Sequence, residues 1–114
     1  MRRLVVDALR KDGHEVVEAS DGRQLLIQVT AATKPPGPQF DAVISDIRMP
    51  VCSGLAIVEV LRKAHWPVPV ILMTAFGDEE TKTRAAELGA VLLHKPFAIA
   101  DLRAAVLTFL PRAS

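Results

Sequence analysis

The sequence predicts an α/β fold, in which a doubly wound parallel β-sheet has helices on both faces. Short apolar segments rich in Val and Ile alternate along the chain with longer segments whose apolar residues recur at helical spacing. The two clearest strands, Asp41–Asp46 and Val68–Thr74, are nearly continuous in apolar residues, as expected of parallel strands buried on both faces. A chain of 114 residues has the length of one domain, so we expect a single domain over residues 1–114.

The chain is predicted to begin with a helix over Met1–Lys11. Its last turn is basic and Gly13 follows as a stop signal. A strand that ends at Asp7 is the alternative, but only seven residues separate Asp7 from the next predicted strand. A crossover between parallel strands needs at least about 10 to 12 residues, so we expect a helix with Asp7 on its solvated surface. Its apolar stripe consists of Leu4, Val5, Ala8 and Leu9.

A short strand and a second helix are expected next. Glu15–Ala19 has the valine-containing pattern of a short strand, and Ser20 and Asp21 offer capping side chains for the helix that follows. The proline-rich stretch Lys34–Pro38 is predicted to be a surface loop, because proline lacks the amide donor and restricts the residue before it. The apolar residues of the second helix are Leu25, Leu26, Val29 and Ala32.

The remaining elements alternate between helix and strand. A helix over Leu55–Ala64 lies between the two clearest strands, and another begins at Asp78 and is closed by Gly89. The last elements are a strand over Ala90–Leu93 and a helix over Ile99–Leu110. The residues expected to face the core from the first and last of these helices are Leu55, Val58, Leu61, Leu102, Val106 and Phe109.

The composition excludes several classes of function. The 14 basic and 13 acidic residues are interspersed, which gives no clustered basic surface for nucleic acid. The longest apolar runs are about six residues, against roughly 20 needed to span a bilayer, and no signal segment opens the sequence. The single cysteine, Cys52, cannot form an internal disulfide. We therefore expect a cytoplasmic protein without direct contact to nucleic acid or to a membrane.

Polar side chains stand at the ends of three predicted strands, at Asp46, Thr74 and Lys95. In an open α/β sheet the ligand crevice lies outside the carboxyl ends of the strands, so a carboxylate, a hydroxyl and an ammonium group are expected to meet there. Each residue alone has an ordinary explanation, such as capping a turn, bonding a loop amide or being solvated. Their joint placement at three strand ends makes a functional site the better interpretation.

The segments around these residues resemble the three signature blocks of the CheY-like receiver domains of two-component signalling. The blocks are SDIRMP over residues 45–50 followed by Gly54, LMTAFGD over residues 72–78, and HKPF over residues 94–97. The stretches MTAFGDEET and RAAELGA are most similar to receivers attached to NtrC-type transcription activators. The resemblance covers residues 1–110 and implies a flavodoxin-like fold.

The resemblance also implies a role for each strand-end residue. Asp46 matches the aspartate that accepts a phosphoryl group, Thr74 the hydroxyl that bonds a phosphoryl oxygen, and Lys95 the lysine that pairs with it. A cis Lys95–Pro96 peptide bond is implied as well, together with a Mg²⁺ ion held by Asp46 and the backbone carbonyl of Arg48. The implied partners are a sensor histidine kinase or phosphotransfer protein, and an output domain or partner protein. Such a domain is a switch and not a turnover enzyme.

The start of the sequence departs from the family pattern. In receivers a strand precedes the first helix, ends in an acidic pair that helps to bind Mg²⁺, and lies centrally in a sheet of order 2-1-3-4-5. This sequence begins at the helix, so we expect weak Mg²⁺ binding, because hard cations prefer several oxygen ligands including carboxylates. Loss of about four buried apolar side chains corresponds to about 6 to 12 kcal/mol. We therefore expect a rearranged sheet, an interleaved homodimer, or a true start that lies upstream.

Two other functions are weighed against this one. The missing acidic pair, and Leu92 at the position where receivers usually carry a switch aromatic, would also suit a degenerate receiver that binds proteins independently of phosphorylation. Labelling with a small phosphodonor would distinguish such a degenerate receiver from a receiver that accepts a phosphoryl group. A nucleotide- or flavin-binding enzyme on the same kind of sheet fits poorly, because the sequence has no glycine-rich phosphate loop.

Overall fold

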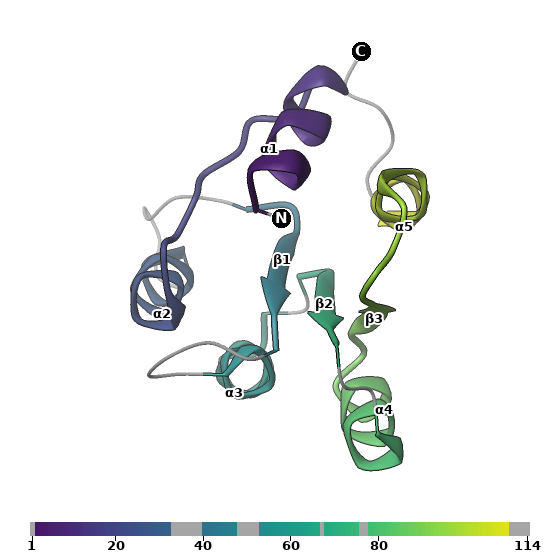
Figure 1. Ribbon diagram of the computed structural model, residues 1–114. Coiled ribbons are helices and arrows are strands. Elements are labelled where there is room, and N and C mark those ends of the chain that lie inside the picture. Colours follow the sequence, from purple (N-terminus) through teal and green to yellow (C-terminus); the bar gives the residue numbers. More distant parts are fainter. Residues whose placement is uncertain (1, 33–39, 48–52, 67, 76–77, 110–114) are drawn as a thin grey trace.

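The computed structural model describes residues 2–32, 40–47, 53–66, 68–75 and 78–109, with the side chains of Arg2, Ala32 and Phe109 left aside. The predicted proline-rich loop lies outside these residues. The elements in chain order are α1 (Arg2–Lys11), α2 (Gly22–Ala32), β1 (Val43–Asp46), α3 (Gly54–Lys63), β2 (Val70–Thr74), α4 (Glu79–Glu87), β3 (Val91–His94) and α5 (Ile99–Phe109). Figure 1 shows the strands at the centre of the molecule with the helices around them. Within this part of the chain, no helix combines the length and apolarity that crossing a membrane requires.

The strands form one parallel sheet in the order β1-β2-β3. Val43 lies opposite Val70 in the first pair of strands, and Thr74 lies opposite His94 in the second. Every residue of the central strand β2 is buried, which agrees with its nearly continuous apolar sequence. The predicted parallel α/β sheet is therefore confirmed, with β1 and β2 each beginning two residues later than predicted.

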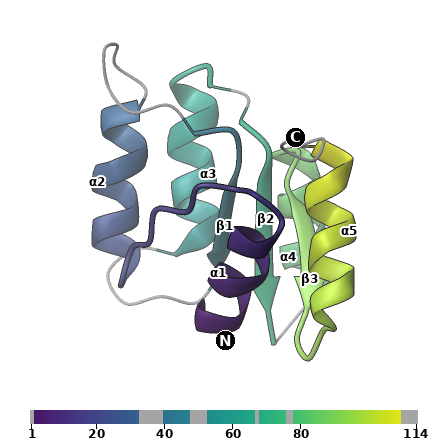
Figure 2. The same cartoon turned by 90° about the horizontal axis from the view of Figure 1, so that it is seen from above.

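Helices cover both faces of the sheet, as Figures 1 and 2 show. A hydrophobic core layer lies on each face of the sheet, and β2 contributes side chains to both layers. Ile71 and Met73 pack on one face, and Val70 and Leu72 pack on the other. The buried helix residues of the first layer, from α1 and α5, are Val5, Leu9, Leu102 and Val106. Those of the second layer, from α2, α3 and α4, are Val29, Ile57, Val58, Leu61 and Ala85.

Helix α1 confirms the helical prediction for the N-terminal segment, with one correction to its buried stripe. Leu4 was expected in the core but is 59% exposed, and Val6 is buried instead. Spacing alone does not fix how an amphipathic helix is turned about its axis, and α1 packs against α5 as well as against the sheet. Asp7 lies on the exposed side, 3.9 Å from the guanidinium of Arg3, as predicted.

The predicted strand over Glu15–Ala19 is wrong. The segment has no regular secondary structure, and within the described residues β1 pairs with β2 alone. The carbonyl of Val16 accepts a hydrogen bond from the side chain of Arg10 (3.4 Å). That of Glu18 accepts one from the side chain of Gln28 (3.1 Å). A strand-like sequence forms a strand only beside a neighbouring ladder, and here side chains of the flanking helices supply donors.

Side-chain caps fix where α3 and α4 begin. The hydroxyl of Ser53 accepts a hydrogen bond from the amide of Ala56 (3.1 Å). The carboxylate of Asp78 accepts one from the amide of Thr81 (2.7 Å). These bonds satisfy amides that the first turn of a helix leaves unpaired. Helix α3 therefore begins one residue earlier than predicted, and α4 begins at Glu79, one residue later than the predicted start at Asp78.

The side chain of Arg62 joins the turn after α3 to the turn after α4. Its guanidinium donates hydrogen bonds to the carbonyl oxygens of Leu88 (2.7 Å), Trp66 (3.0 Å) and Val68 (2.9 Å). Burial lowers the pKa of Arg62, because desolvation disfavours the charged guanidinium. These contacts anchor the chain just before the amino end of β2.

His65 follows α3 in the left-handed conformation, with φ of 59°. A Cβ atom is disfavoured there by about 1 to 2 kcal/mol, whereas glycine adopts the conformation freely. We expect His65→Gly to raise the free energy of unfolding by about 0.5 to 1 kcal/mol in urea denaturation, because glycine relieves the backbone strain. The imidazole that is removed is exposed, so its loss should cost little. Lys63→Gly, inside the helix, should lower it by up to about 1 kcal/mol. A destabilising His65→Gly would contradict the prediction.

Candidate functional site

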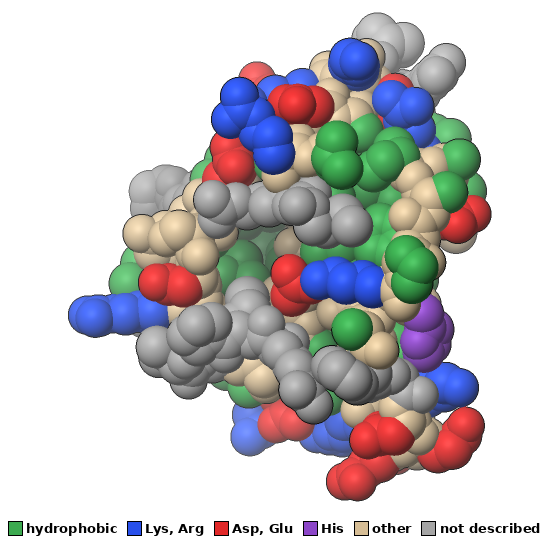
Figure 3. All heavy atoms as spheres, in the orientation of Figure 1, with side chains coloured by type: hydrophobic (Ala, Val, Ile, Leu, Met, Phe, Trp, Pro, Cys, Tyr) green, Lys and Arg blue, Asp and Glu red, His purple; other side chains and the backbone are tan. Residues whose placement is uncertain are grey.

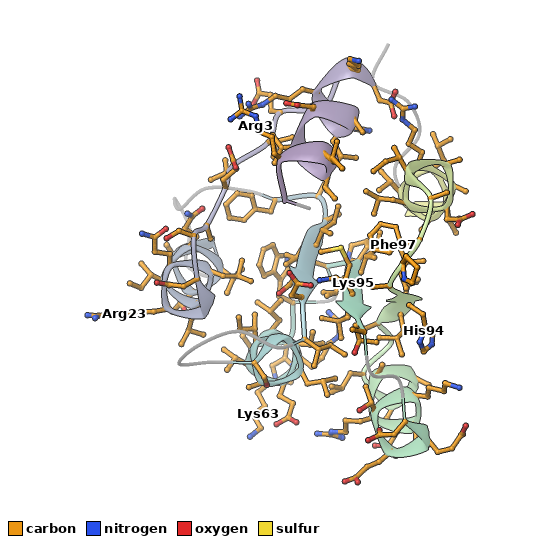
Figure 4. All side chains as sticks on the ribbon, viewed as in Figure 1. Arg3, Arg23, Lys63, His94, Lys95 and Phe97 are labelled. Atoms are coloured by element: carbon orange, nitrogen blue, oxygen red, sulfur yellow. The ribbon has the colours of Figure 1, made fainter. Side chains whose placement is uncertain are left out.

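The three predicted site residues meet at the carboxyl edge of the sheet. Asp46 is the last residue of β1, Thr74 is the last residue of β2, and Lys95 directly follows β3. The strands are parallel and adjacent, so their carboxyl ends share one edge. Figure 4 shows Lys95 pointing from the end of β3 toward β1.

Lys95 and Asp46 form an ion pair, in which Nζ of the lysine contacts Oδ1 of the aspartate. Their side chains are 29% and 38% exposed, respectively, so the pair is partly screened from water and yet open to a ligand. The backbone amide of Lys95 donates a hydrogen bond to the carbonyl of Thr74 (2.7 Å). The Lys95–Pro96 peptide bond is cis, as predicted. The loop after β3 is therefore tied directly to the end of β2.

Thr74 lies next to this pair in the sheet. In the register of β1 and β2, Asp46 lies opposite Met73, so Thr74 is one position further along the neighbouring strand. Thr74 is only 4% exposed. A hydroxyl can both donate and accept a hydrogen bond, so this residue brings a buried polar group to the strand ends beside the carboxylate.

The backbone around Asp46 is packed closely against Gly54, at the start of α3. The amide of Gly54 donates a hydrogen bond to the carbonyl of Ile47 (2.9 Å). A Cβ atom on Gly54 would lie 2.6 Å from the carbonyl oxygen of Asp46 and 3.0 Å from Cδ2 of Leu72. Gly54 therefore sets the position of the end of β1. The sequence motif contains this glycine without assigning it a role, because the approach of two backbone segments is visible only in three dimensions.

The described donors do not by themselves fit a divalent cation. Within the described residues, no group of three or more His, Cys, Asp or Glu side chains could hold a metal ion. Asp46 is already paired with Lys95, and Arg48, whose carbonyl was predicted to be a ligand, lies outside the described residues. Mg²⁺ usually takes one or two carboxylates together with other oxygens. The described residues thus supply Asp46 as a ligand candidate without completing a site.

The arrangement suits the transfer of an anionic group to the carboxylate. A carboxylate that is reachable from solvent can act as a nucleophile. The neighbouring ammonium of Lys95 can stabilise negative charge on an incoming group, and a preorganised cation is effective because it needs no reorganisation during the reaction.

Comparison with known proteins places the chain among signalling domains. The family model for the response regulator receiver domain matches residues 1–107. The chain is 34% identical over 116 residues to sporulation initiation phosphotransferase F of Bacillus subtilis, a match that covers 100% of this chain and 88% of that protein. It is 43% identical over 76 residues to the transcriptional regulatory protein CusR of Escherichia coli, a match that covers 66% of this chain. The chain spans only about a third of CusR, with 34% of that protein matched.

Solved structures show the same fold. The receiver domain of the Francisella response regulator 1452 superimposes with a TM-score of 0.82 and 25% sequence identity, covering 94% of this chain and 84% of that chain. The chemotaxis protein CheY4 of Vibrio cholerae superimposes with a TM-score of 0.78 and 30% identity, covering 96% of this chain and 88% of that chain. The predicted CheY-like, flavodoxin-like fold class is therefore confirmed.

Proposed function

This chain belongs to the response regulator receiver domains, and from that premise we propose that it accepts a phosphoryl group on Asp46 and acts as a phosphorylation-dependent switch. The observation that carries the proposal is the ion pair between Asp46 and Lys95 at the carboxyl edge of the sheet. Receiver domains interact with histidine kinases or phosphotransfer proteins and with output domains. A sensor histidine kinase or phosphotransfer protein is accordingly the expected phosphodonor for this chain.

In the proposed reaction, a carboxylate oxygen of Asp46 forms a bond to phosphorus while the bond between phosphorus and the leaving atom of the donor breaks. The leaving atom keeps the electron pair of that bond, and in a phosphohistidine donor it is an imidazole nitrogen. Lys95 lies beside the attacking oxygen, where its charge offsets that of the phosphoryl group. The partial exposure of Asp46 leaves it accessible to the donor.

Phosphorylation would change the charge at the strand ends. A phosphoryl group adds negative charge and several acceptor oxygens, so we expect Lys95 to follow the new oxygens and the hydroxyl of Thr74 to bond one of them. The backbone hydrogen bond between Lys95 and Thr74 already joins the loops after β2 and β3. A shift of one loop should therefore move the other, which gives an output partner a changed surface to recognise.

Chemical labelling of the full chain tests the proposal. After incubation with acetyl phosphate, with and without Mg²⁺, intact mass spectrometry should show the gain of one phosphoryl group. The added group should be removed by hydroxylamine, because an acyl phosphate is cleaved by strong nucleophiles. The absence of any mass gain, with acetyl phosphate or with a phosphorylated histidine donor, would remove phosphoryl acceptance from the function of this chain.

Receiver domains generally bind Mg²⁺, but we expect this chain to bind it weakly. The carboxylate of Asp46 is paired with Lys95, and the described residues complete no acidic cluster around it. Calorimetric titration should give a dissociation constant above about 1 mM, because Mg²⁺ usually takes one or two carboxylates together with other oxygens. The Asp46→Asn variant, which lacks the candidate carboxylate ligand, is the negative control for this titration. Much tighter binding would show that other groups of the chain complete the coordination shell.

Lys95→Met is expected to impair the switch without unfolding the protein. Both members of the ion pair are partly exposed, so its loss should lower the free energy of unfolding by at most about 1 kcal/mol in urea denaturation. The amide resonance of Thr74 should then shift far less on phosphorylation than in the parent chain. Lys63→Met removes the same charge at the end of α3, away from the strand ends (Figure 4), and should switch normally. Normal switching of Lys95→Met would contradict the assigned role.

A further inference from the structure

Ser45 is a buried polar residue in a strand that is otherwise apolar up to Asp46. It stands directly before Asp46 in β1 and is only 5% exposed. Val43, two positions earlier and thus on the same face of the sheet, packs in the apolar layer with α2 and α3. Burying a hydroxyl costs free energy unless the group forms a hydrogen bond. Serine at this buried position therefore indicates a polar role that alanine or valine would not fill.

The hydroxyl of Ser45 donates a hydrogen bond of 2.9 Å to the backbone carbonyl of Asp46. The same peptide group is also held through its N–H, because the amide of Ile47 donates a hydrogen bond of 2.9 Å to the carbonyl of Met73 in β2. A trans peptide group is planar, with its C=O and N–H on opposite sides. The peptide that follows Asp46 is therefore fixed from both sides, by the Ser45 hydroxyl on one and by β2 on the other.

The start of α3 leaves little room for this peptide to turn. The Cβ position of Gly54 lies 2.6 Å from the carbonyl oxygen of Asp46. It also lies 3.0 Å from Cδ2 of Leu72, the register partner of Ser45 in β2. The carboxylate of Asp46 is joined to the same peptide through its Cα atom. The contacts that fix the peptide therefore also set the direction in which the carboxylate points toward Lys95.

We propose that Ser45 is a positioning residue for phosphoryl uptake, which acts by fixing the peptide that follows Asp46. The role rests on the proposed function of Asp46. Ser45 itself is buried, whereas an acidic and a basic side chain meet at the surface in the centre of Figure 3, where Asp46 pairs with Lys95. Misplacement of a reacting group by about 1 Å can slow a reaction by about 100-fold. A smaller reorientation of the carboxylate should therefore slow uptake measurably.

Two variants of nearly equal shape distinguish the effect of the hydroxyl from the effect of volume. Ser45→Thr keeps the hydroxyl, Ser45→Val replaces it with a methyl group, and both add one further methyl group. Ser45→Ala removes the hydroxyl without adding volume. With acetyl phosphate and the full chain, mass spectrometry over time should show uptake about five- to tenfold slower in Ser45→Ala and Ser45→Val, as expected for loss of one hydrogen bond. Ser45→Thr should stay within about twofold of the parent rate, because it keeps the donor.

The amide resonance of Ile47 reports on the hydrogen bond without any phosphoryl transfer. This amide belongs to the same peptide group as the carbonyl of Asp46, and hydrogen bonds in a chain polarise one another. We expect the resonance to shift in Ser45→Ala and Ser45→Val, and much less in Ser45→Thr. Urea denaturation should show that every variant is folded under the conditions of the uptake measurement.

Thr108→Val is the matched control. The hydroxyl of Thr108 donates a hydrogen bond to the carbonyl of Ala104 (3.0 Å), near the C-terminal end of α5. This variant loses the same kind of hydrogen bond as the Ser45 variants. It should change neither the rate of uptake nor the resonance of Ile47.

Three results would overturn the proposal, and they can be told apart. Uptake by Ser45→Ala and Ser45→Val at the parent rate would show that the hydroxyl does not position Asp46. Equal slowing in Ser45→Thr and Ser45→Val would show that packing volume controls the rate. If the parent chain gained no phosphoryl group, the proposed function would fail and the positioning role would fall with it, even where the resonance of Ile47 responded to loss of the hydroxyl.

Discussion

Asp46→Asn is expected to abolish phosphoryl uptake while leaving the protein folded. An amide oxygen lacks the negative charge that makes the carboxylate nucleophilic, but the two side chains have almost the same shape. Asp46 ends β1 with its side chain 38% exposed, so loss of its ion pair should change the free energy of unfolding by less than about 1 kcal/mol. Intact mass spectrometry after incubation with acetyl phosphate measures uptake, and urea denaturation measures stability.

Asp41 supplies the matched control for this experiment. It is an exposed residue just before β1, at the opposite edge of the sheet from Lys95 and Thr74. Asp41→Asn makes the same chemical change and should leave uptake intact. Full uptake by Asp46→Asn would place the acceptor elsewhere. Loss of uptake by both variants, with the fold preserved in urea denaturation, would mean that neither carboxylate is the specific acceptor.

The convergence of the strand-end residues could be predicted from the sequence because it follows from a general property of parallel sheets. Once the apolar runs before Asp46, Thr74 and Lys95 are assigned as neighbouring parallel strands, their carboxyl ends must share one edge. The structure confirms this convergence.

Other features depend on partners that a local pattern does not contain. The Glu15–Ala19 segment has a strand-like sequence, but a strand also requires a second segment beside it. Leu4 belongs to a regular helical stripe, but its exposure depends on how α1 is turned against both the sheet and α5. In each case the sequence predicted the tendency of the segment, and tertiary contacts decided the result.

Gly54→Ala is expected to damage both stability and phosphoryl uptake. The new Cβ atom would lie 2.6 Å from the carbonyl oxygen of Asp46, and a backbone oxygen cannot rotate away as the end of a flexible side chain can. Either the end of β1 or the start of α3 must therefore move. Overpacking of this kind costs about 1 to 3 kcal/mol, and displacement of Asp46 from Lys95 should reduce uptake as well.

Gly89→Ala is the control that distinguishes the effect of steric overlap, expected at Gly54, from the effect of backbone strain. Gly89 has φ of 70°, and nothing within the described residues lies within 4 Å of the Cβ position. Alanine should therefore cost about 1 kcal/mol through backbone conformation alone, without affecting uptake at Asp46. Urea denaturation and mass spectrometry on both variants should show stability lost in each but uptake lost only in Gly54→Ala. Normal uptake by a folded Gly54→Ala protein would show that the contact with Gly54 does not control the position of Asp46.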